Sequence, residues 1–243
     1  MKSGTFALFL ILGMLLFGAV LPAAAADDGT LTDNATIYYN AAEMALGNGN
    51  YTTAIGLYDL ALAENTTQIR LNDALLYTYR DKAYAQIQLG NYSEAIVTLD
   101  TGIQEYPNDE MIWNNKGYAQ YKLGQYRDAV TSYDKALSIN GNYTTALINK
   151  GNAHLILGNT NDAIASYKAA LASDPGNSVA TTKLAQAEKQ AAAEQSQILM
   201  ILAVLVIVAI IAVAWYVTRK NAGKKDTDDG KKPDSKKKVN KKK

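Results

Sequence analysis

The chain has 243 residues, no cysteine and a single histidine, and its 24 Lys/Arg nearly balance its 23 Asp/Glu. Without a thiol or a second imidazole, the chain forms no disulfide bond, no thiol-based active site and no multi-histidine metal site, so neither metal nor cofactor is expected. The charges are segregated, because residues 27–197 carry a net charge of −8 and residues 219–243 one of +8, and such an asymmetry indicates parts that face different partners or compartments.

Residues 1–26 have the pattern of a secretory signal peptide. Lys2 precedes an apolar run from Phe6 to Val20, and small residues come after it up to Ala26. We expect cleavage near Ala26, and the alternative is an uncleaved signal anchor. Both versions export the chain from residue 27 onward, and residues 27–34 are predicted to form a linker.

Between residues 35 and 177 a similar phrase recurs four times, as NGNYTTAIGLYDLAL, LGNYSEAIVTLDTGI, LGQYRDAVTSYDKAL and LGNTNDAIASYKAAL. Gly90, Gly124 and Gly158 follow one another at intervals of 34 residues, and Gly49 precedes Gly90 by 41. A period of this size indicates stacked supersecondary units. We therefore predict four helix-turn-helix units at 35–68, 76–109, 110–143 and 144–177, with an insertion at 69–75 whose role the sequence leaves open.

The second helix expected in each unit alternates small and large residues at spacings of three and four. This spacing places them on one helix face, where small side chains let the neighbouring helix approach and a large one fills the remaining gap. The small, large and small positions are Ala54, Tyr58 and Ala61, then Ala95, Leu99 and Gly102, then Ala129, Tyr133 and Ala136, then Ala163, Tyr167 and Ala170.

This pattern resembles the tetratricopeptide repeat, and the third unit carries it as Trp113, Lys116, Gly117, Gln120, Ala129, Tyr133 and Ala136. The resemblance implies an all-α fold in which antiparallel helix pairs stack into a right-handed superhelix. The sequence departs from the family pattern at Lys82, Lys116 and Lys150, where the family favours Leu, and at Thr66 and Gly141, where it favours Pro.

The resemblance also implies that the first helix of each pair lines a concave groove that binds peptides or extended protein segments. Asn donates to and accepts from a peptide backbone, and Tyr offers a flat apolar ring with a polar tip. The alternative is that these side chains only solvate the surface. The groove positions are Tyr39, Asn40, Glu43, Arg80, Asp81, Tyr84, Asn114, Asn115, Tyr118, Asn149 and Asn152.

One subset of the family holds a C-terminal carboxylate with a clamp of Lys, Asn and Arg side chains. Arg80 and Asn115 match two members of that clamp, but Thr145 and Asn149 stand where further cations are expected. The incomplete clamp and the exported location argue against a cytosolic chaperone adaptor. We interpret the lone His154 as a packing residue, and no catalytic constellation is recognised, so the chain is not expected to be an enzyme.

The C-terminal part predicts a membrane anchor. Residues 178–197 are rich in helix formers and are expected to cap the last repeat. Residues 198–217 form an uncharged apolar run that is long enough to span a bilayer. Arg219 and Lys220 come directly after the run, and positive charge stays on the cytoplasmic side, which places residues 27–197 outside the cytoplasm.

Residues 218–243 are predicted to form a disordered, basic cytoplasmic tail that contacts anionic lipid. Nucleic-acid binding is not expected, because the tail has no aromatic residues among its lysines. Five Asn-x-Ser/Thr sequons precede the apolar run and none comes after it, so they are candidate N-glycosylation sites. These sequons begin at Asn34, Asn50, Asn65, Asn91 and Asn142.

Together these features predict a single-pass protein of the cell membrane whose exported repeat domain binds another, unidentified polypeptide as a scaffold in complex assembly. The predicted mechanism is binding without chemistry. The alternatives are a structural element of the cell surface or envelope, in which the groove stays empty, and an accessory subunit of a membrane enzyme or secretion complex.

Overall fold

The computed structural model describes residues 34–64 and 74–228, and over these residues the chain is helical, with no strand. The predicted signal peptide, Asn65, residues 69–73 of the insertion and residues 229–243 lie outside the described residues. The all-α prediction is confirmed. The helices are α2 (Asn34–Gly47), α3 (Tyr51–Glu64), α5 (Ala74–Gln88), α6 (Tyr92–Glu105), α7 (Glu110–Lys122), α8 (Tyr126–Ile139), α9 (Thr144–Ile156), α10 (Thr160–Ser173) and α11 (Ser178–Asp228).

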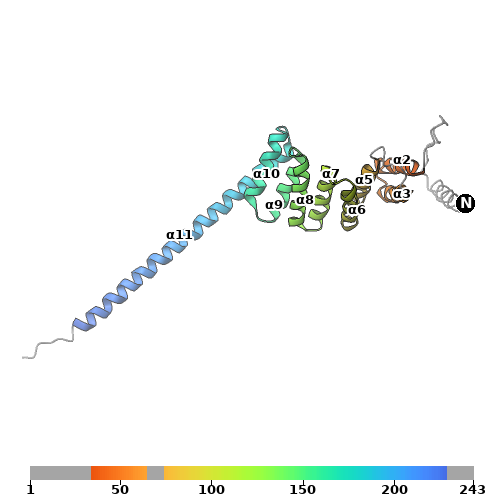
Figure 1. Cartoon of the computed structure of the whole chain (residues 1–243). Coiled ribbons are helices and arrows are strands. Elements are labelled where there is room, and N and C mark those ends of the chain that lie inside the picture. Colours follow the sequence, from red (N-terminus) through yellow and green to blue (C-terminus); the bar gives the residue numbers. More distant parts are fainter. Residues whose placement is uncertain (1–33, 65–73, 229–243) are drawn as a thin grey trace, which may run out of the picture. The chain divides into compact units, whose positions relative to one another are not determined.

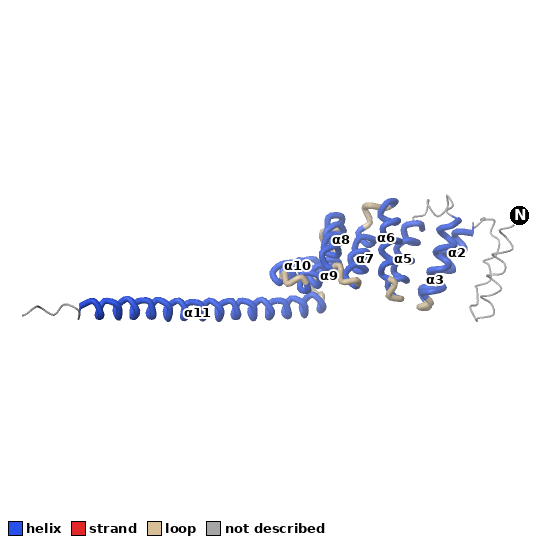
Figure 2. Tube along the Cα trace, turned by 90° about the horizontal axis from the view of Figure 1, so that it is seen from below, coloured by secondary structure: helices blue, strands red, loops and turns tan. Residues whose placement is uncertain are grey.

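Contacts divide the described part of the chain into two units, one that ends at Ala187 and one that begins at Glu188. In the first unit the helices pair in chain order, α2 with α3, α5 with α6, α7 with α8 and α9 with α10, and the pairs stack side by side (Figures 1 and 2). This arrangement confirms the predicted solenoid of helix pairs. Ala74 and Leu75, which the sequence places in the insertion, form the first residues of α5.

Each helix pair turns at a glycine with a left-handed backbone. Gly49, Gly90, Gly124 and Gly158 have φ angles between 72° and 81°, a region that costs other residues free energy. At the second turn the Gly90 N–H donates to the Ile87 carbonyl at 3.0 Å and the Asn91 N–H to the Gln86 carbonyl at 2.9 Å. This is a Schellman ending, and the same two bonds recur at the other three turns.

The core of each pair is built from the small and large positions of its second helix, as the sequence predicts. Tyr58, Leu99, Tyr133 and Tyr167 are fully buried. In the third pair, α7 comes close to the Tyr133 ring of α8 at Gly117. A Cβ added at Gly117 would lie 2.7 Å from that ring, so glycine is the residue that fits there. Burial of this apolar area is what makes one pair depend on the next.

The three lysines that depart from the family pattern link successive units. Each reaches back from the first helix of one pair to an aspartate on the second helix of the preceding pair, at 2.5–2.6 Å. Because the aspartates are half exposed, each ion pair contributes on the order of 0–1 kcal/mol, and the same geometry recurs at all three junctions between units. The pairs are Lys82 with Asp59, Lys116 with Asp100 and Lys150 with Asp134.

Helix α11 begins inside the first unit. The Ala180 N–H donates to the Asn177 side chain at 2.9 Å, and Ala180, Leu184 and Ala187 join apolar clusters with residues of α9 and α10. Leu184 stands one period after Lys150, at the position that lysine occupies in the earlier units. These contacts cover the apolar face of the last pair, which is what a terminal element of a solenoid must do.

The second unit contains the apolar part of α11, where Ile198–Val217 are exposed along the helix. By length and composition, the stretch Ser178–Lys220 contains a segment able to cross a membrane. The helix continues to Asp228, so residues 218–228, which the sequence assigns to a disordered tail, are helical in the structure.

Candidate protein-binding surface

All eleven predicted groove residues lie on the first helices of the four pairs, α2, α5, α7 and α9. We call the surface that these helices share the first-helix face. Its side chains divide into two groups, because some are already engaged in holding helices together and others keep free hydrogen-bonding groups or exposed rings. The division decides which of them are available to a partner.

Two predicted groove residues hold a buried tyrosine of their own helix pair. Glu43 accepts a hydrogen bond from the Tyr58 hydroxyl, and Asn152 accepts one from the Tyr167 hydroxyl at 2.9 Å. Burial raises the pKa of both phenols, that of Tyr167 to about 12, so both remain neutral donors. Sequence reasoning missed this second role, although each acceptor precedes its tyrosine by 15 residues.

The third pair lacks such an acceptor. Tyr118 stands at the position equivalent to Glu43 and Asn152, and the buried hydroxyl of Tyr133 has no hydrogen-bond partner among the residues that the structure describes. A buried hydroxyl without a partner costs about 1–3 kcal/mol.

Removing these hydroxyls should therefore have opposite effects in different pairs. We expect Tyr58→Phe and Tyr167→Phe each to lower the free energy of unfolding by about 1 kcal/mol, because each loses a hydrogen bond. Tyr133→Phe loses none and should leave stability unchanged or raise it by up to about 1 kcal/mol. Urea unfolding followed by circular dichroism measures the difference, and an equal loss in all three variants would contradict the assignment.

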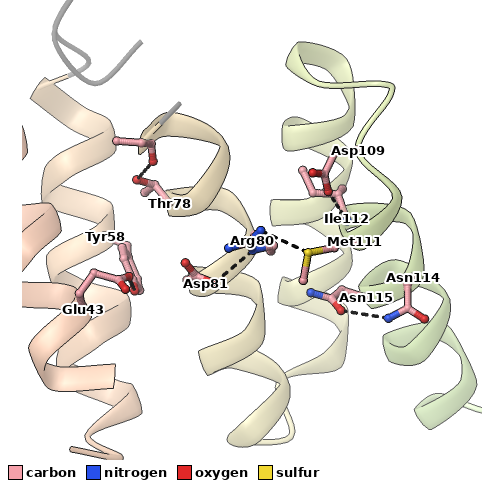
Figure 3. A network of polar contacts seen from close by, with 11 residues as sticks. Glu43, Tyr58, Thr78, Arg80, Asp81, Asp109, Met111, Ile112, Asn114 and Asn115 are labelled. Atoms are coloured by element: carbon pink, nitrogen blue, oxygen red, sulfur yellow. Dashed lines mark hydrogen bonds and ion pairs between the residues drawn. The ribbon is translucent and has the colours of Figure 1, made fainter. Parts of the chain in front are cut away.

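A charged group with a neighbouring aromatic ring occupies the face at α5, and Figure 3 shows its members Arg80, Asp81 and Met111. Arg80 Nε lies 3.4 Å from Asp81 Oδ1, and another guanidinium nitrogen lies 3.4 Å from the Met111 sulfur. The guanidinium also stacks 4.7 Å from the Tyr77 ring centroid. Tyr77 and Met111 are 38% exposed, and sequence reasoning missed both, although they stand one 34-residue period apart on successive first helices.

An amide ladder crosses from α9 to α7. The Asn149 amide donates to Asn114 Oδ1 at 3.2 Å, and the Asn114 amide donates to Asn115 Oδ1 at 3.3 Å. Asn114 is buried, whereas Asn115 and Asn149 are partly exposed. The two outer amides therefore keep an N–H donor on Asn115 and a carbonyl acceptor on Asn149, which are the groups that pair with a peptide backbone.

The remaining predicted residues add rings and one exposed amide. Tyr84 is 44% exposed and meets Tyr51 edge to face, with 6.4 Å between centroids. Tyr118 packs against the central apolar cluster, and Lys122 Nζ lies 5.5 Å from its ring centroid. Asn40 is exposed on α2.

His154 lies outside this face as a partly buried residue of α9. Together with Lys150 and Asp162 it lines a shallow hollow between α8, α9 and α10. Burial lowers its pKa, and Asp162 opposes that shift. Its ring nitrogen Nδ1 lies 3.5 Å from the Asn159 amide. The ring is partly buried, and its role as a packing residue stays a prediction.

The described sequons lie at helix ends. Asn34 begins α2, Asn50 and Asn91 come directly after the turn glycines of the first two pairs, and Asn142 lies between α8 and α9. All four are exposed. Asn34 lies at the start of a first helix, whereas Asn50, Asn91 and Asn142 lie between helices.

Two family models, each described as tetratricopeptide repeat, match residues 32–116 and 114–178. No curated protein sequence matches the chain. Among solved structures, MamA residues 41 to the end from Desulfovibrio magneticus RS-1 is 18% identical, with a TM-score of 0.58 over 69% of this chain and 90% of that one. YrrB, described as a TPR protein with an unusual peptide-binding site, is 17% identical, with a TM-score of 0.53 over 61% of this chain and 73% of that one. At these identities the likeness concerns the fold alone.

Proposed function

Because this chain belongs to the tetratricopeptide repeat family, we propose that it is an exported, membrane-anchored scaffold that binds an extended segment of another protein on its first-helix face. The proposed role is binding without chemistry. The observation that carries the proposal is the row of exposed rings and incompletely used amides on α5, α7 and α9.

Three large side chains on neighbouring first helices are well exposed: Tyr77, Tyr84 and Met111. Tyrosine and methionine are enriched in protein interfaces, where they bury much area with few strongly hydrated groups. Beside them the amide ladder offers one donor and one acceptor. Rings that anchor side chains and amides that pair with backbone suit an extended chain, and YrrB is described as a protein of this fold with a peptide-binding site.

The location is also a proposal. The N-terminal signal pattern, the uncharged run at 198–217 and the adjoining Arg219 and Lys220 support an exported repeat domain with a cytoplasmic tail. The lysines of that tail lie beside the membrane, where anionic lipid attracts them. In this orientation the exposed sequons at Asn34, Asn50, Asn91 and Asn142 lie on the side where N-glycans are added, with Asn65 as a fifth acceptor.

One crosslinking experiment tests both the face and its location. A crosslinker that does not cross membranes is added to intact cells carrying the full chain, and captured proteins are quantified by mass spectrometry. We expect the variant Tyr77→Ala, Tyr84→Ala, Met111→Ala to lose at least about fivefold of the specific capture, since interface anchors contribute over 1 kcal/mol each.

The matched control removes exposed apolar side chains from second helices, with Val97→Ala and Ile139→Ala, and should retain capture. If the triple variant of Tyr77, Tyr84 and Met111 captures as much protein as the Val97 and Ile139 control, the first-helix face is not the binding surface. Capture that requires a membrane-permeant reagent would show that the domain is not exported.

A further inference from the structure

The first-helix face carries an excess of negative charge where α2 meets α5. Glu43 and Asp81 occupy these neighbouring helices, and Asp81 points toward Glu43 and Tyr58 (Figure 3). Burial raises the pKa of Asp81, the carboxylate of Glu43 raises it further, and Arg80 lowers it. Arg80 pairs with Asp81, whereas no cation among the described residues forms an ion pair with Glu43, which accepts a hydrogen bond from Tyr58.

The surroundings of the two carboxylates favour an organic cation. Tyr39 and Tyr58 lie beside them with 6.3 Å between ring centroids, and burial, Glu43 and Asp81 raise the pKa of Tyr39 to about 12, so it stays uncharged. The face of Tyr77 already accepts the guanidinium of Arg80 at 4.7 Å. Because Tyr58 is fully buried and Arg80 covers the Tyr77 ring, the attraction for an ammonium or guanidinium group comes from the two carboxylates, with the partly exposed Tyr39 ring beside them.

The rest of the domain reinforces this preference. Residues 27–197 carry a net charge of −8, which speeds the approach of a basic segment and slows that of an acidic one. Toward α7 and α9 the face offers the neutral amides of Asn115 and Asn149, and Lys122 lies beside Tyr118 on α7. The carboxylates of the predicted groove residues lie on α2 and α5, so a basic side chain is expected at that end.

We propose that the α2–α5 end of the first-helix face binds a Lys or Arg side chain, and that the partner segment is an extended, basic polypeptide. This inference rests on the proposed function and specifies the partner class. Glu43 keeps its bond to Tyr58 while its second oxygen receives the cation, and Asp81 shares its carboxylate between Arg80 and the incoming charge.

The test measures binding of three fluorescent peptides to the full chain in neutral detergent by anisotropy. The peptides are identical except at a few positions that hold Lys, Gln or Glu. We expect the Lys peptide to bind about tenfold or more tightly than the Gln peptide, and the Glu peptide to bind more weakly than either. The double variant Glu43→Gln, Asp81→Asn keeps the hydrogen-bond acceptors and should reduce the preference for Lys to about twofold or less.

The matched control Glu94→Gln, Asp128→Asn removes the same total charge from exposed sites on second helices and should keep the preference within about twofold of the unchanged protein. Equal losses in both double variants would assign the effect to overall charge and overturn the proposal. Equal binding of all three peptides, with crosslinked capture retained, would overturn only the basic partner class. Absence of both peptide binding and capture would overturn the proposed function as well.

Discussion

Gly151→Ala is expected to lower the free energy of unfolding of the repeat domain by about 2 kcal/mol, although alanine is the better helix former. A Cβ at this position would lie 2.5 Å from Tyr167 Cε1 and 2.8 Å from its Cζ. Tyr167 is fully buried and its hydroxyl is held by Asn152, so the ring has no free volume to enter. Overpacking costs about 1–3 kcal/mol, and we expect the upper end of that range here because three ring atoms of Tyr167 lie within 3 Å of the added Cβ. Subtracting a helix-propensity gain of about 1 kcal/mol leaves a net loss of about 2 kcal/mol.

The matched control is Gly56→Ala. Gly56 lies inside α3, and nothing is within 4 Å of the Cβ that alanine would add, so only the propensity gain operates there and stability should rise by about 0.5–1 kcal/mol. Urea titrations of the two variants therefore move in opposite directions. A gain in stability from Gly151→Ala would show that α9 and α10 separate freely and would contradict the close approach.

The second pair of the same chain suggests how to relieve the overlap. There Ala83 stands where Gly151 stands in the fourth pair, and Leu99 stands in place of Tyr167. Adding Tyr167→Leu to Gly151→Ala should therefore cost less than the sum of the two single changes, with a coupling of at least about 1 kcal/mol. The first pair has alanine, Ala42, opposite a tyrosine, Tyr58, so that combination occurs in this chain at another helix spacing. In the fourth pair the spacing is restricted, because α11 packs against both α9 and α10.

The fold was predictable because a solenoid is specified locally and repeatedly. The turn glycines, the buried tyrosines and the small residues opposite them recur at one spacing, so an error in one unit is corrected by the others. Contacts between residues far apart in the sequence contribute little to specifying the fold, since each helix pair packs only against its immediate neighbours. The first pair and the insertion gave the weakest signal, and residues 65–73 lie outside the described residues.

The hydrogen-bond and ion-pair partners of individual polar side chains could not be predicted from the sequence in the same way. Glu43 and Asn152 were assigned to the groove, yet both also accept a hydrogen bond from a buried tyrosine. The lysine at 116 looked like a departure from the family pattern, yet it pairs with Asp100 of the preceding unit. Helix periodicity gives the face on which a side chain lies, whereas its partner depends on distances between helices.

Ile112→Ala is expected to lower the free energy of unfolding by about 3 kcal/mol, within the range for truncating a buried aliphatic side chain. Ile112 is fully buried at the start of α7, and it packs in one cluster with Ala83, Leu99 and Ala119. Its Cδ1 lies 3.2 Å from the place where a Cβ on Gly102 would be. The side chain therefore fills the space between the second and third helix pairs, and its loss leaves a cavity there.

The position of this cavity predicts a change in cooperativity as well as in stability. Each pair of a solenoid is stabilised by its neighbours, so weakening the central junction should let α2–α6 and α7–α10 unfold at separate denaturant concentrations. Hydrogen exchange followed by mass spectrometry would then show earlier loss of protection in one half. Val97→Ala, at a side chain that is 68% exposed on the neighbouring helix α6, is the control and should change stability by less than about 0.5 kcal/mol. A single sharp transition in Ile112→Ala with an unchanged midpoint would show that the junction does not couple the two halves.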